Sequence, residues 1–316
     1  MSVYLITGIS GYLGGRILQS LKDKPDVDRI IGVDVVEPPT IPDIVDFHPM
    51  DVRDEALREL ARAEKVEVFI HLAFVLNPIY NLVKMHSIDV WGADNVLQAA
   101  AACKATQVFV TSSASAYGAL PDNPEPLIED HPLRAPRSYQ YAYDKAKIDR
   151  MCRGFMGTHP EINMTIVRPC IVLGPNVDNY ISRGITMGLR FHIDGQDPTM
   201  QFVHEDDVAR ACLMCIEQKA RGTYNLVGKD TVKMSEMWQM MEGKIPPVNF
   251  RPWLIYPLVD LMWQLGVLFE APSGQLDFMR WPWWCSGEKI KNEVGFEPKY
   301  NSRETLKQFL DANEQR

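Results

Sequence analysis

The stretch "TGISGYLG" at residues 7–14 decides the fold. Its three glycines are spaced three apart, and they lie between an apolar run at residues 3–7 and a run with helical apolar spacing at residues 12–24. This order predicts a strand, a tight turn and a helix that begins in the turn. Glycines at such a junction let the backbone approach a pyrophosphate, while the first N–H groups of the helix point at its charge. The motif predicts a dinucleotide site, and a structural turn is the alternative.

Asp34, at the end of the second predicted strand, extends this interpretation. A carboxylate at this position accepts hydrogen bonds from both ribose hydroxyls of an adenosine. A 2′-phosphate would meet like charge there, and no Arg or Lys follows among residues 35–37. The sequence therefore predicts that the cofactor is NAD rather than NADP.

Strand-like and helix-like runs alternate over the first two thirds of the chain. The strand-like runs are apolar throughout, at residues 3–7, 29–33, 66–72, 107–111 and 164–168. The helix-like runs lie between them, at residues 12–24, 54–64, 86–103 and 138–156. Continuous apolar strands that alternate with helices are typical of a parallel sheet covered on both faces. The sequence predicts an α/β protein with a Rossmann-type, doubly wound parallel sheet.

The alternation fails after Pro169, where the chain becomes rich in proline. We expect residues 1–169 to form the NAD-binding domain, to which residues 201–228 return with a short strand near 201–203 and a helix from 206. Residues 170–200 and 229–316 are expected to form a smaller, irregular substrate-binding region.

Composition narrows the class of protein. The chain has 316 residues, of which 46 % are hydrophobic and 23 % charged, as in ordinary globular proteins. Its formal charge of −8 and the lack of a basic block argue against a nucleic-acid partner. The six cysteines are scattered, which favours reduced thiols and a cytoplasmic protein. The apolar run that starts at Val3 leaves no room for a charged leader with a cleavable signal.

The run "WLIYPLVDLMWQLGVLF" at residues 253–269 is nearly all apolar. It is shorter than a bilayer span, and Pro257 and Asp260 interrupt it. Its helical spacing predicts a buried face on a core or pocket-lid helix, with membrane-surface contact or an oligomer interface as alternatives. The residues of the predicted buried face are Leu254, Leu258, Leu261, Met262, Leu265 and Leu268.

The glycine motif resembles that of the short-chain dehydrogenase/reductase family, in particular its extended branch of NAD-dependent epimerases and dehydratases. Further stretches match the same branch in order: "MDVRD", "HLAF", "DVWGADNVLQAA" with Asn95 as a structural residue, "RPCIVLGP" and "QFVHEDDVARA". In the resemblance, "MDVRD" holds the adenine ring and "RPCIVLGP" passes the nicotinamide. The resemblance implies these NAD-binding residues: Gly8, Ser10, Gly11, Tyr12, Leu13, Gly14, Asp34, Asp51, Val52, Leu72, Ala73, Phe74, Tyr141, Lys145 and Pro169.

The family's reaction uses a Tyr phenol, a nearby Lys and a Ser or Thr hydroxyl. A free phenol has a pKa near 10, and a neighbouring ammonium lowers it toward the range useful for proton transfer. The family's hydroxyl lies four residues before a Tyr-Gly pair, here Tyr117, which implies Ser113 as the catalytic residue with Ser112 as the second choice.

Two Tyr-x-x-x-Lys pairs compete within "SYQYAYDKAKIDRMCRGF". In the family motif, an acidic residue lies four after the Lys and apolar residues lie six, seven and ten after it. Lys145 gives Asp149 and three apolar residues, which favours Tyr141 with Lys145. A small residue commonly precedes the Lys, and this favours the other pair, Tyr143 with Lys147.

Two further motifs are given structural interpretations. Cys212 and Cys215 lie inside an apolar helix rather than at its start, so they predict packing thiols. In "HEDD", Asp206 and Asp207 are expected to cap the helix that follows. We therefore predict no metal site.

The substrate is predicted to be a small molecule of apolar character. Nucleotide-sugar epimerases usually carry an Arg before the aromatic residue of "QFVH", and here residues 198–202 contain none. The tail offers "MRWPWWC", with Arg280 among tryptophans that either line a pocket or fill the core.

The first functional hypothesis is an NAD-dependent dehydrogenase or reductase for a secondary alcohol or ketone, for example a sterol-like, terpenoid or aromatic one. A nucleotide-sugar epimerase or dehydratase with tightly held NAD is the second, and a non-catalytic NAD-sensing protein the third. The resemblance also implies a homodimer that pairs through the helices at 86–103 and 138–156.

Overall fold

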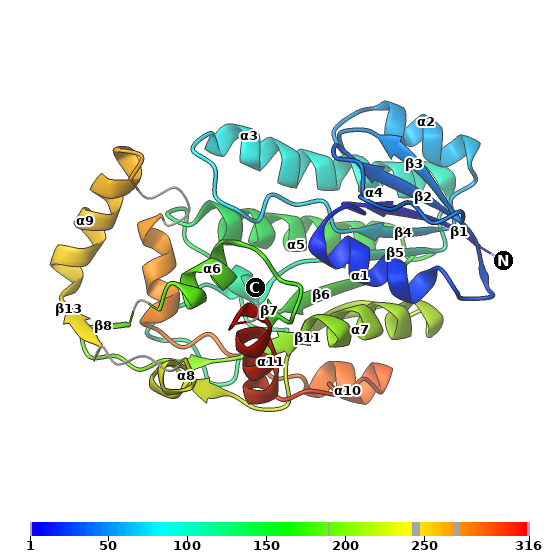
Figure 1. Cartoon of the computed structure of the whole chain (residues 1–316). Helices are drawn as coiled ribbons and strands as arrows, with labels where there is room; N and C mark the ends of the chain where they lie inside the picture. The colour runs from blue at the N-terminus through cyan, green and yellow to red at the C-terminus, as the bar shows by residue number, and fades with distance from the viewer. Residues whose placement is uncertain (1, 189, 242–246, 268–271, 315–316) are drawn as a thin grey trace.

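The computed structural model describes residues 2–188, 190–241, 247–267 and 272–314. Its centre is a seven-stranded sheet in the order β11-β6-β5-β4-β1-β2-β3, and all neighbouring strands are parallel (Figure 1). The strands are β1 (Ser2–Thr7), β2 (Val27–Asp34), β3 (Val45–Pro49), β4 (Val68–His71), β5 (Gln107–Thr111), β6 (Asn163–Pro169) and β11 (Gly222–Leu226). The α/β, doubly wound fold class predicted from the sequence is confirmed.

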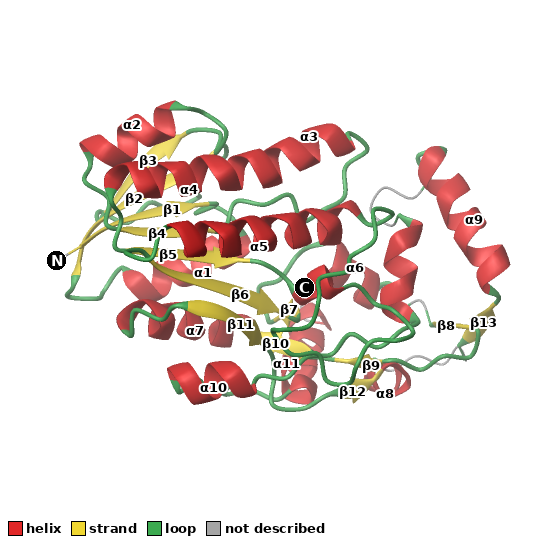
Figure 2. Cartoon of the chain, turned by 180° about the vertical axis from the view of Figure 1, so that it is seen from behind, coloured by secondary structure: helices red, strands yellow, loops and turns green. Residues whose placement is uncertain are grey.

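Helices cover both faces of this sheet (Figure 2). On one face α1 (Tyr12–Leu21) packs beside α7 (Glu205–Glu217), and on the other α2 (Ala56–Ala63) packs beside α4 (Gly92–Cys103), which in turn contacts α5 (Gln140–Thr158). Each helix buries an apolar stripe, as in α1, where Ile17, Leu18 and Leu21 face the core. Separate clusters of buried side chains therefore fill the two faces.

The chain runs outward in two directions from the middle of the sheet. β1, β2 and β3 lie on one side, and β4, β5 and β6 lie on the other. The strand order thus reverses between β1 and β4, which is where open α/β sheets bind their ligands, beyond the carboxyl ends of the strands.

Two strands of the central sheet were missing from the sequence prediction. β3 is an edge strand in which polar residues alternate with apolar ones, so it lacks the continuous apolar run of its neighbours. β11 is short and carries Thr223 and Asn225, and it pairs with β6 over its whole length.

The helix predicted at residues 86–103 starts earlier and is not uniform. It begins with α3 (Leu82–His86), widens into a π-helical turn at Ser87–Trp91, and continues as α4. Such single π turns occur frequently at functional sites.

The remaining residues form small two-stranded sheets and short helices. β7 (Ile171–Leu173) pairs with β10 (Phe202–His204), β9 (Thr199–Met200) with β12 (Val232–Lys233), and β8 (Phe191–Ile193) with β13 (Val248–Phe250). The helices of this part are α6 (Tyr180–Thr186), α8 (Met234–Met240), α9 (Pro252–Gln264), a 3-10 helix at Ser273–Met279, α10 (Glu288–Val294) and α11 (Ser302–Glu314).

The apolar run at residues 253–269 forms α9, but the prediction of its buried face is wrong. Leu254, Leu258, Leu261 and Leu265 are exposed, while Ile255 and Val259 on the opposite side are buried. Met262 is half-buried, and residues 268 and 269 lie outside the described residues. The helix stands at the outer edge of the molecule, so the side of its apolar surface that packs is set by its neighbours (Figure 1). No helix within the described ranges is long and apolar enough to span a bilayer.

Candidate active site

The glycine turn lies at the point where the strand order reverses. Gly8 has φ +75°, and a Cβ on it would lie 2.7 Å from the backbone nitrogen of Ala73. A Cβ on Gly14 would collide with the carbonyl oxygen of Gly8. Both positions therefore require glycine, and Gly11 is the N-cap of α1, whose first N–H groups face the turn. This backbone cradle next to Leu72 and Ala73 fits the pyrophosphate of a dinucleotide.

Asp34 ends β2 beside the glycine turn. One of its carboxylate oxygens accepts a hydrogen bond from the Ser10 N–H at 3.1 Å, and the other accepts from the Val36 N–H at 3.2 Å. The Ser10 hydroxyl donates in turn to the Val36 carbonyl. These contacts fix a negative charge next to the cradle, in the position expected for a ribose-binding carboxylate.

The stretch "MDVRD" follows β3 at the same edge of the sheet. Both carboxylate oxygens of Asp51 accept hydrogen bonds from the Arg53 guanidinium, at 2.9 and 2.6 Å. Arg53 thereby holds the pKa of Asp51 below its usual value. Asn95 donates to the Val52 carbonyl at 2.9 Å and to the Asp54 carbonyl at 2.8 Å, which is the structural role expected of it. Arg53 was not singled out from the sequence, although it sits inside a quoted motif.

Tyr12 and Pro169 complete the positions expected around the cofactor. The Tyr12 hydroxyl donates to the buried carboxylate of Glu205, which also accepts from the side chain and backbone of Asn176. This network ties the first turn of α1 to the start of α7. Pro169 ends β6 at the carboxyl edge of the sheet, near the reversal of strand order.

Ser113 and Tyr141 come together between β5 and α5. Ser113 lies close enough to the Tyr141 phenol to lower its pKa. The Ser113 hydroxyl oxygen also accepts hydrogen bonds from the N–H and the hydroxyl of Ser115, at 3.1 and 2.8 Å. The hydroxyl of Ser112 is buried and has no partner within the described part of the chain. Of the two serines considered from the sequence, Ser113 is the one that meets the tyrosine.

Lys145 lies one helical turn after Tyr141 and is almost fully buried. Its Nζ donates to the Thr111 carbonyl at 2.7 Å and lies 3.0 Å from the centre of the Phe74 ring. The ammonium is therefore held at the carboxyl end of β5, beside the "HLAF" stretch.

The competing pair points to another side of α5. The Tyr143 ring lies beside Arg137 and Lys147, and the Lys147 Nζ lies 3.3 Å from His86 Nε2. Tyr143 and Lys147 are thus separated from Ser113.

A buried ion pair fixes the orientation of α5 against the sheet. The Arg168 guanidinium on β6 donates to both carboxylate oxygens of Asp149 at 2.8 Å, and to the hydroxyl of Tyr117 at 2.6 Å. Arg168 and Asp149 are fully buried. Because Asp149 lies one turn after Lys145, this contact holds the turn that carries Tyr141 and Lys145 in register with β5 and β6.

Burial dominates the electrostatics of the site. Burial raises the pKa of the Tyr141 phenol, Tyr139 and Asp89 raise it further, and the nearby Ser113 partly offsets this rise. Burial lowers the pKa of Lys145, whereas the Asp89 carboxylate raises it. The phenol is therefore protonated at neutral pH, and the charge of Lys145 depends on its acidic neighbour.

Asp89 was missed by sequence analysis. It lies on the π-helical turn, is almost fully buried, and accepts a hydrogen bond from the Val75 N–H at 2.8 Å. Burial raises the pKa of its carboxyl, and Lys145 lowers it. The signal in the sequence is an acidic residue on the inner face of the helix predicted at 86–103.

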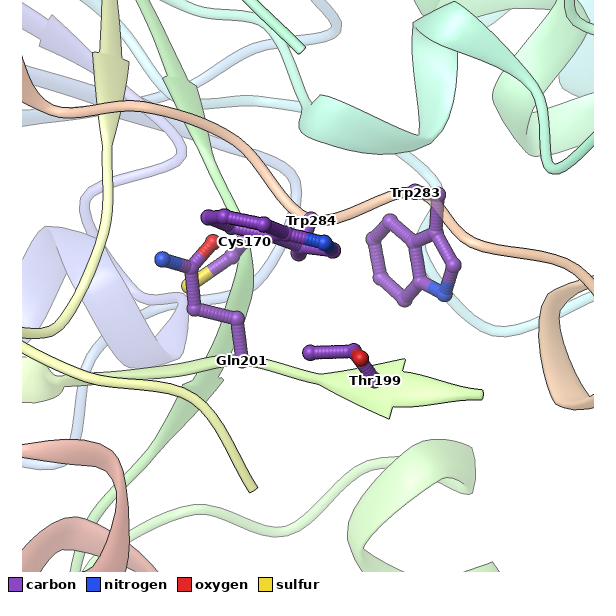
Figure 3. A pocket seen from close by; sticks show the side chains of 5 residues that line it. All are labelled: Cys170, Thr199, Gln201, Trp283 and Trp284. Atoms are coloured by element: carbon purple, nitrogen blue, oxygen red, sulfur yellow. The ribbon is translucent and has the colours of Figure 1, made fainter. Parts of the chain in front are cut away.

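A series of neighbouring aromatic rings connects Tyr141 to Trp283 in the C-terminal part of the chain. The Tyr139 ring lies 6.0 Å from that of Tyr141 and 5.4 Å from that of Phe278, which lies 5.1 Å from Trp283. Beyond them is a narrow crevice with no room for a water molecule (Figure 3). Its lining residues are Cys170, Thr199, Gln201, Trp283 and Trp284.

The polar side chains of this region have protein partners. Gln201 exchanges two hydrogen bonds with the backbone of Cys285, at 3.0 and 3.1 Å. Arg280 lies 3.3 Å from the Asp194 carboxylate and stacks on the Trp281 ring. The Nε of Arg280 is buried and has no hydrogen-bond partner among the described residues, so this guanidinium is only partly engaged.

The "HEDD" stretch starts α7, with one difference from the prediction. The N-cap is His204, whose Nδ1 accepts from the Asp206 N–H at 3.1 Å, rather than an acidic residue. Asp206 pairs with Arg16, and Asp207 accepts hydrogen bonds from the N–H groups of Lys299 and Tyr300. An imidazole precedes the helix with the extended backbone that an N-cap needs.

All six cysteines are free thiols. Cys212 and Cys215 are buried inside α7, and burial raises the pKa of both. Across the described ranges, no three His, Cys, Asp or Glu side chains are grouped to hold a metal ion.

A family model for the NAD-dependent epimerase/dehydratase family matches residues 4–227. The chain belongs to this family. The family consists of NAD-dependent epimerases and dehydratases, and this protein is accordingly an NAD-dependent enzyme. The match begins in β1 and ends just after β11, so it spans the whole central sheet.

Several proteins are similar to this chain in sequence or in structure. An uncharacterized protein of Mycobacterium tuberculosis is 26 % identical over 322 residues, covering 98 % of this chain and 83 % of the relative. Tetraketide alpha-pyrone reductase 2 of Arabidopsis thaliana is 25 % identical over 273 residues, covering 79 % and 85 %. The structure of dTDP-glucose 4,6-dehydratase from Bacillus anthracis with NAD superposes with a TM-score of 0.76 at 16 % identity, covering 100 % and 97 %.

Proposed function

We propose that this member of the family is an oxidoreductase that transfers hydride between NAD and a secondary alcohol or ketone. The position of Lys145, buried at the carboxyl end of β5 one turn after Tyr141, carries the proposal, and Ser113 lies close enough to Tyr141 to lower the pKa of its phenol. Ser113, Tyr141 and Lys145 are the proposed catalytic residues. An acid, an orienting hydroxyl and a cation are the groups that carbonyl reduction needs around the reacting oxygen.

NAD, when bound, supplies or accepts the hydride at the reacting carbon. Ser113 orients the substrate oxygen through its hydroxyl, and Tyr141 donates its proton to that oxygen in reduction or takes it back in oxidation. Lys145, kept charged by Asp89, favours the phenolate that is left after the proton transfer. Because the Tyr141 phenol is protonated at neutral pH, it can donate the proton that reduction of a carbonyl group requires.

The proposed NAD-binding residues follow the geometry of the cradle. Gly8, Gly11 and Gly14 would accommodate the pyrophosphate, and Asp34 would bind the adenosine ribose. The other proposed contacts come from the adjoining turns and strand ends, with the nicotinamide near Pro169: Ser10, Tyr12, Leu13, Asp51, Val52, Leu72, Ala73, Phe74, Tyr141 and Lys145.

We propose an apolar or aromatic substrate. The line of rings from Tyr141 to Trp283 supports this, since aromatic walls suit flat or apolar molecules. The plant relative is named a reductase, which favours net reduction.

A nucleotide-sugar epimerase or dehydratase remains the second candidate, since the family model carries that name. The intact arrangement of Ser113, Tyr141 and Lys145 weighs against a non-catalytic NAD sensor.

We also propose that the enzyme is cytoplasmic. Residues 1–169 and 201–228 would form its NAD-binding domain, and residues 170–200 and 229–316 its substrate-binding region. The proposed homodimer would pair through α4 and α5.

A spectrophotometric screen tests the function. Ketones, secondary alcohols and UDP-sugars are offered to the purified protein with NADH or NAD, and absorbance at the nicotinamide band is followed. We expect net oxidation of NADH with an apolar ketone. Sugar interconversion without net NADH change, with NAD that resists dialysis, would instead indicate an epimerase.

The matched pair Tyr141→Phe and Tyr143→Phe tests the site. Loss of the general acid is expected to lower kcat by about 10²–10⁴-fold in Tyr141→Phe. Tyr143→Phe, two residues further along the same helix, should keep its activity. The reverse result would assign the chemistry to Tyr143 and Lys147.

A further inference from the structure

The π-helical turn at Ser87–Trp91 lies between α3 and α4 and carries Asp89 at its centre. Asp89 is almost fully buried, so the direction in which its carboxylate points depends on how the turn is held. Turns of this kind are rare within helices. Contacts from outside the helix must therefore favour this geometry over a continuous α-helix.

Arg53 makes such a contact from the "MDVRD" stretch. Its Nη1 donates to the Ser87 hydroxyl oxygen at 2.8 Å, while its Nε and Nη2 donate to the two carboxylate oxygens of Asp51. The Ser87 hydroxyl donates its own proton to the Lys84 carbonyl at 2.8 Å, so it accepts from Arg53. The planar guanidinium therefore links Asp51 to the first residue of the π-helical turn.

The residue that follows the turn lies against the same stretch. A Cβ on Gly92 would lie 2.5 Å from the Cγ2 of Val52, so the helix backbone approaches this side chain as closely as glycine allows. Between these two contacts, Asp89 accepts the hydrogen bond from the Val75 N–H at 2.8 Å. The turn is thus held at both ends by the "MDVRD" stretch and at its centre by the segment after β4.

Asp89 and Lys145 interact from different helices. Phe74, the neighbour of Val75 in the chain, has its ring centre 3.0 Å from the Lys145 Nζ. The hydrogen bond with the Val75 N–H therefore brings the Asp89 carboxylate to the segment that contacts the lysine. Because the two charges are opposite, Asp89 raises the pKa of Lys145.

Other titratable groups also surround Lys145. Those on its own helix are Asp144, Asp149 and Cys152, and His71 approaches from β4. Asp144 forms a hydrogen bond with His86, and Asp149 pairs with Arg168. Asp89 accepts instead from a backbone N–H, and its charge acts on Lys145 more strongly than theirs. The position of the π-helical turn therefore governs the charge of the lysine.

We propose that Arg53 is a positioning residue for the reaction, because it holds the π-helical turn and so keeps the Asp89 carboxylate beside Lys145. The proposal rests on the proposed function, in which Lys145 acts on the Tyr141 phenol. Arg53 itself does not reach the reacting atoms. It connects Asp51, a proposed cofactor contact, with the charge that acts at the other end of the cofactor site.

The pH profile of kcat/KM at saturating cofactor tests the proposal, with whichever substrate the activity screen identifies. Arg53→Met should release the turn, so that Asp89 moves away and the pKa values of Lys145 and Tyr141 fall. The alkaline limb is expected to move down by about one pH unit, as in Asp89→Asn. Ser87→Ala removes the same contact without removing a charge, and it should move the limb in the same direction. It is also the milder change, which keeps the test valid if Arg53→Met does not fold.

Arg58→Met is the matched control. Arg58 donates to the side-chain oxygen of Asn95 at 2.8 Å, on α4 beyond the turn. This variant therefore also removes a cation and a contact with the same helix, yet its alkaline limb should stay in place. The double variant Arg53→Met/Asp89→Asn should shift no further than Asp89→Asn alone, because both changes act through the same carboxylate.

The sign of the shift separates positioning from a direct effect of charge. Loss of the Arg53 cation, acting by charge alone, would raise the pKa of Lys145 and move the limb to higher pH. Such a shift, or an unmoved limb in Arg53→Met or in Ser87→Ala, would overturn this proposal and leave the proposed function standing. A wild type that turns over no ketone, alcohol or UDP-sugar would refute the proposed function, and this proposal with it.

Discussion

The two parts of this molecule are built by different rules. In residues 2–169 strands alternate with helices, except that β2 leads directly to β3, and one sheet joins all of these strands. In the rest, pairs of short strands join distant segments, such as β8 with β13, and contacts such as Gln201 with Cys285 span the chain. The first part is specified by local patterns, and the second by which distant segments meet.

The largest difference between the two parts should appear in stability, when a buried ion pair and a partly exposed one are each broken. Arg168→Met leaves the buried Asp149 with only the exposed Arg153 as an ion-pair partner, and we expect a loss of about 3 kcal/mol in the free energy of unfolding. Arg280→Met, in the other part, breaks a partly exposed pair and should cost below about 1 kcal/mol. Urea unfolding measures both, and equal losses would contradict the contrast.

The glycine turn gives the next effect. Gly14→Ala forces a methyl group into the Gly8 carbonyl, so NAD affinity should fall by about 100-fold through distortion of the cradle. Gly15→Ala is the control, because a Cβ there meets nothing within 4 Å. Calorimetric titration with NAD compares them. If both bind equally, the backbone around Gly14 adapts and the turn is less constrained than its contacts indicate.

A substitution at Asp34 should have a smaller effect, on the preference for NAD over NADP rather than on the fold. Asp34→Ala removes the charge that would repel a 2′-phosphate, so the ratio of NAD to NADP affinity should fall about tenfold. Asp28→Ala on the same strand is exposed and serves as control. An unchanged ratio in Asp34→Ala would refute the ribose assignment.

The smallest expected effect is a displaced pH profile. The Asp89 charge raises the pKa values of Lys145 and of Tyr141, so Asp89→Asn lowers both. The ammonium and the protonated phenol are then each lost at a lower pH, and the alkaline limb of kcat/KM should move down by about one pH unit. Asp94→Asn, exposed on the same helix, should leave the limb in place. A shift to higher pH would be the wrong sign for this arrangement.

Much of the first part could be read from the sequence because its determinants are local. The glycine spacing, the apolar strands and the carboxylate of Asp34 each lie within a few residues of what they explain. The choice of Tyr141 over Tyr143 also rested on helical spacing, and the buried pairing of Asp149 with Arg168 gives that spacing a physical reason.

The rest could not be read because its determinants are distant. Leu254, Leu258 and Leu261 have the spacing of a buried face, yet only the position of α9 decides which side of the helix meets the core. Asp89 gains its meaning from Lys145, which lies on another helix. β11 has too few apolar residues to be recognised alone, and β6 supplies the partner that makes it a strand.

That last pairing has a practical consequence for anyone who would divide the protein. β11 covers the outer edge of β6, and it arrives only after the chain has left the sheet at Pro169 and returned at Gly222. A fragment that stopped at Pro169 would expose a long, apolar edge with unsatisfied N–H and C=O groups, which invites aggregation. Soluble expression of the nucleotide-binding part therefore requires that residues 170–226 be kept or shortened as a loop, never cut away.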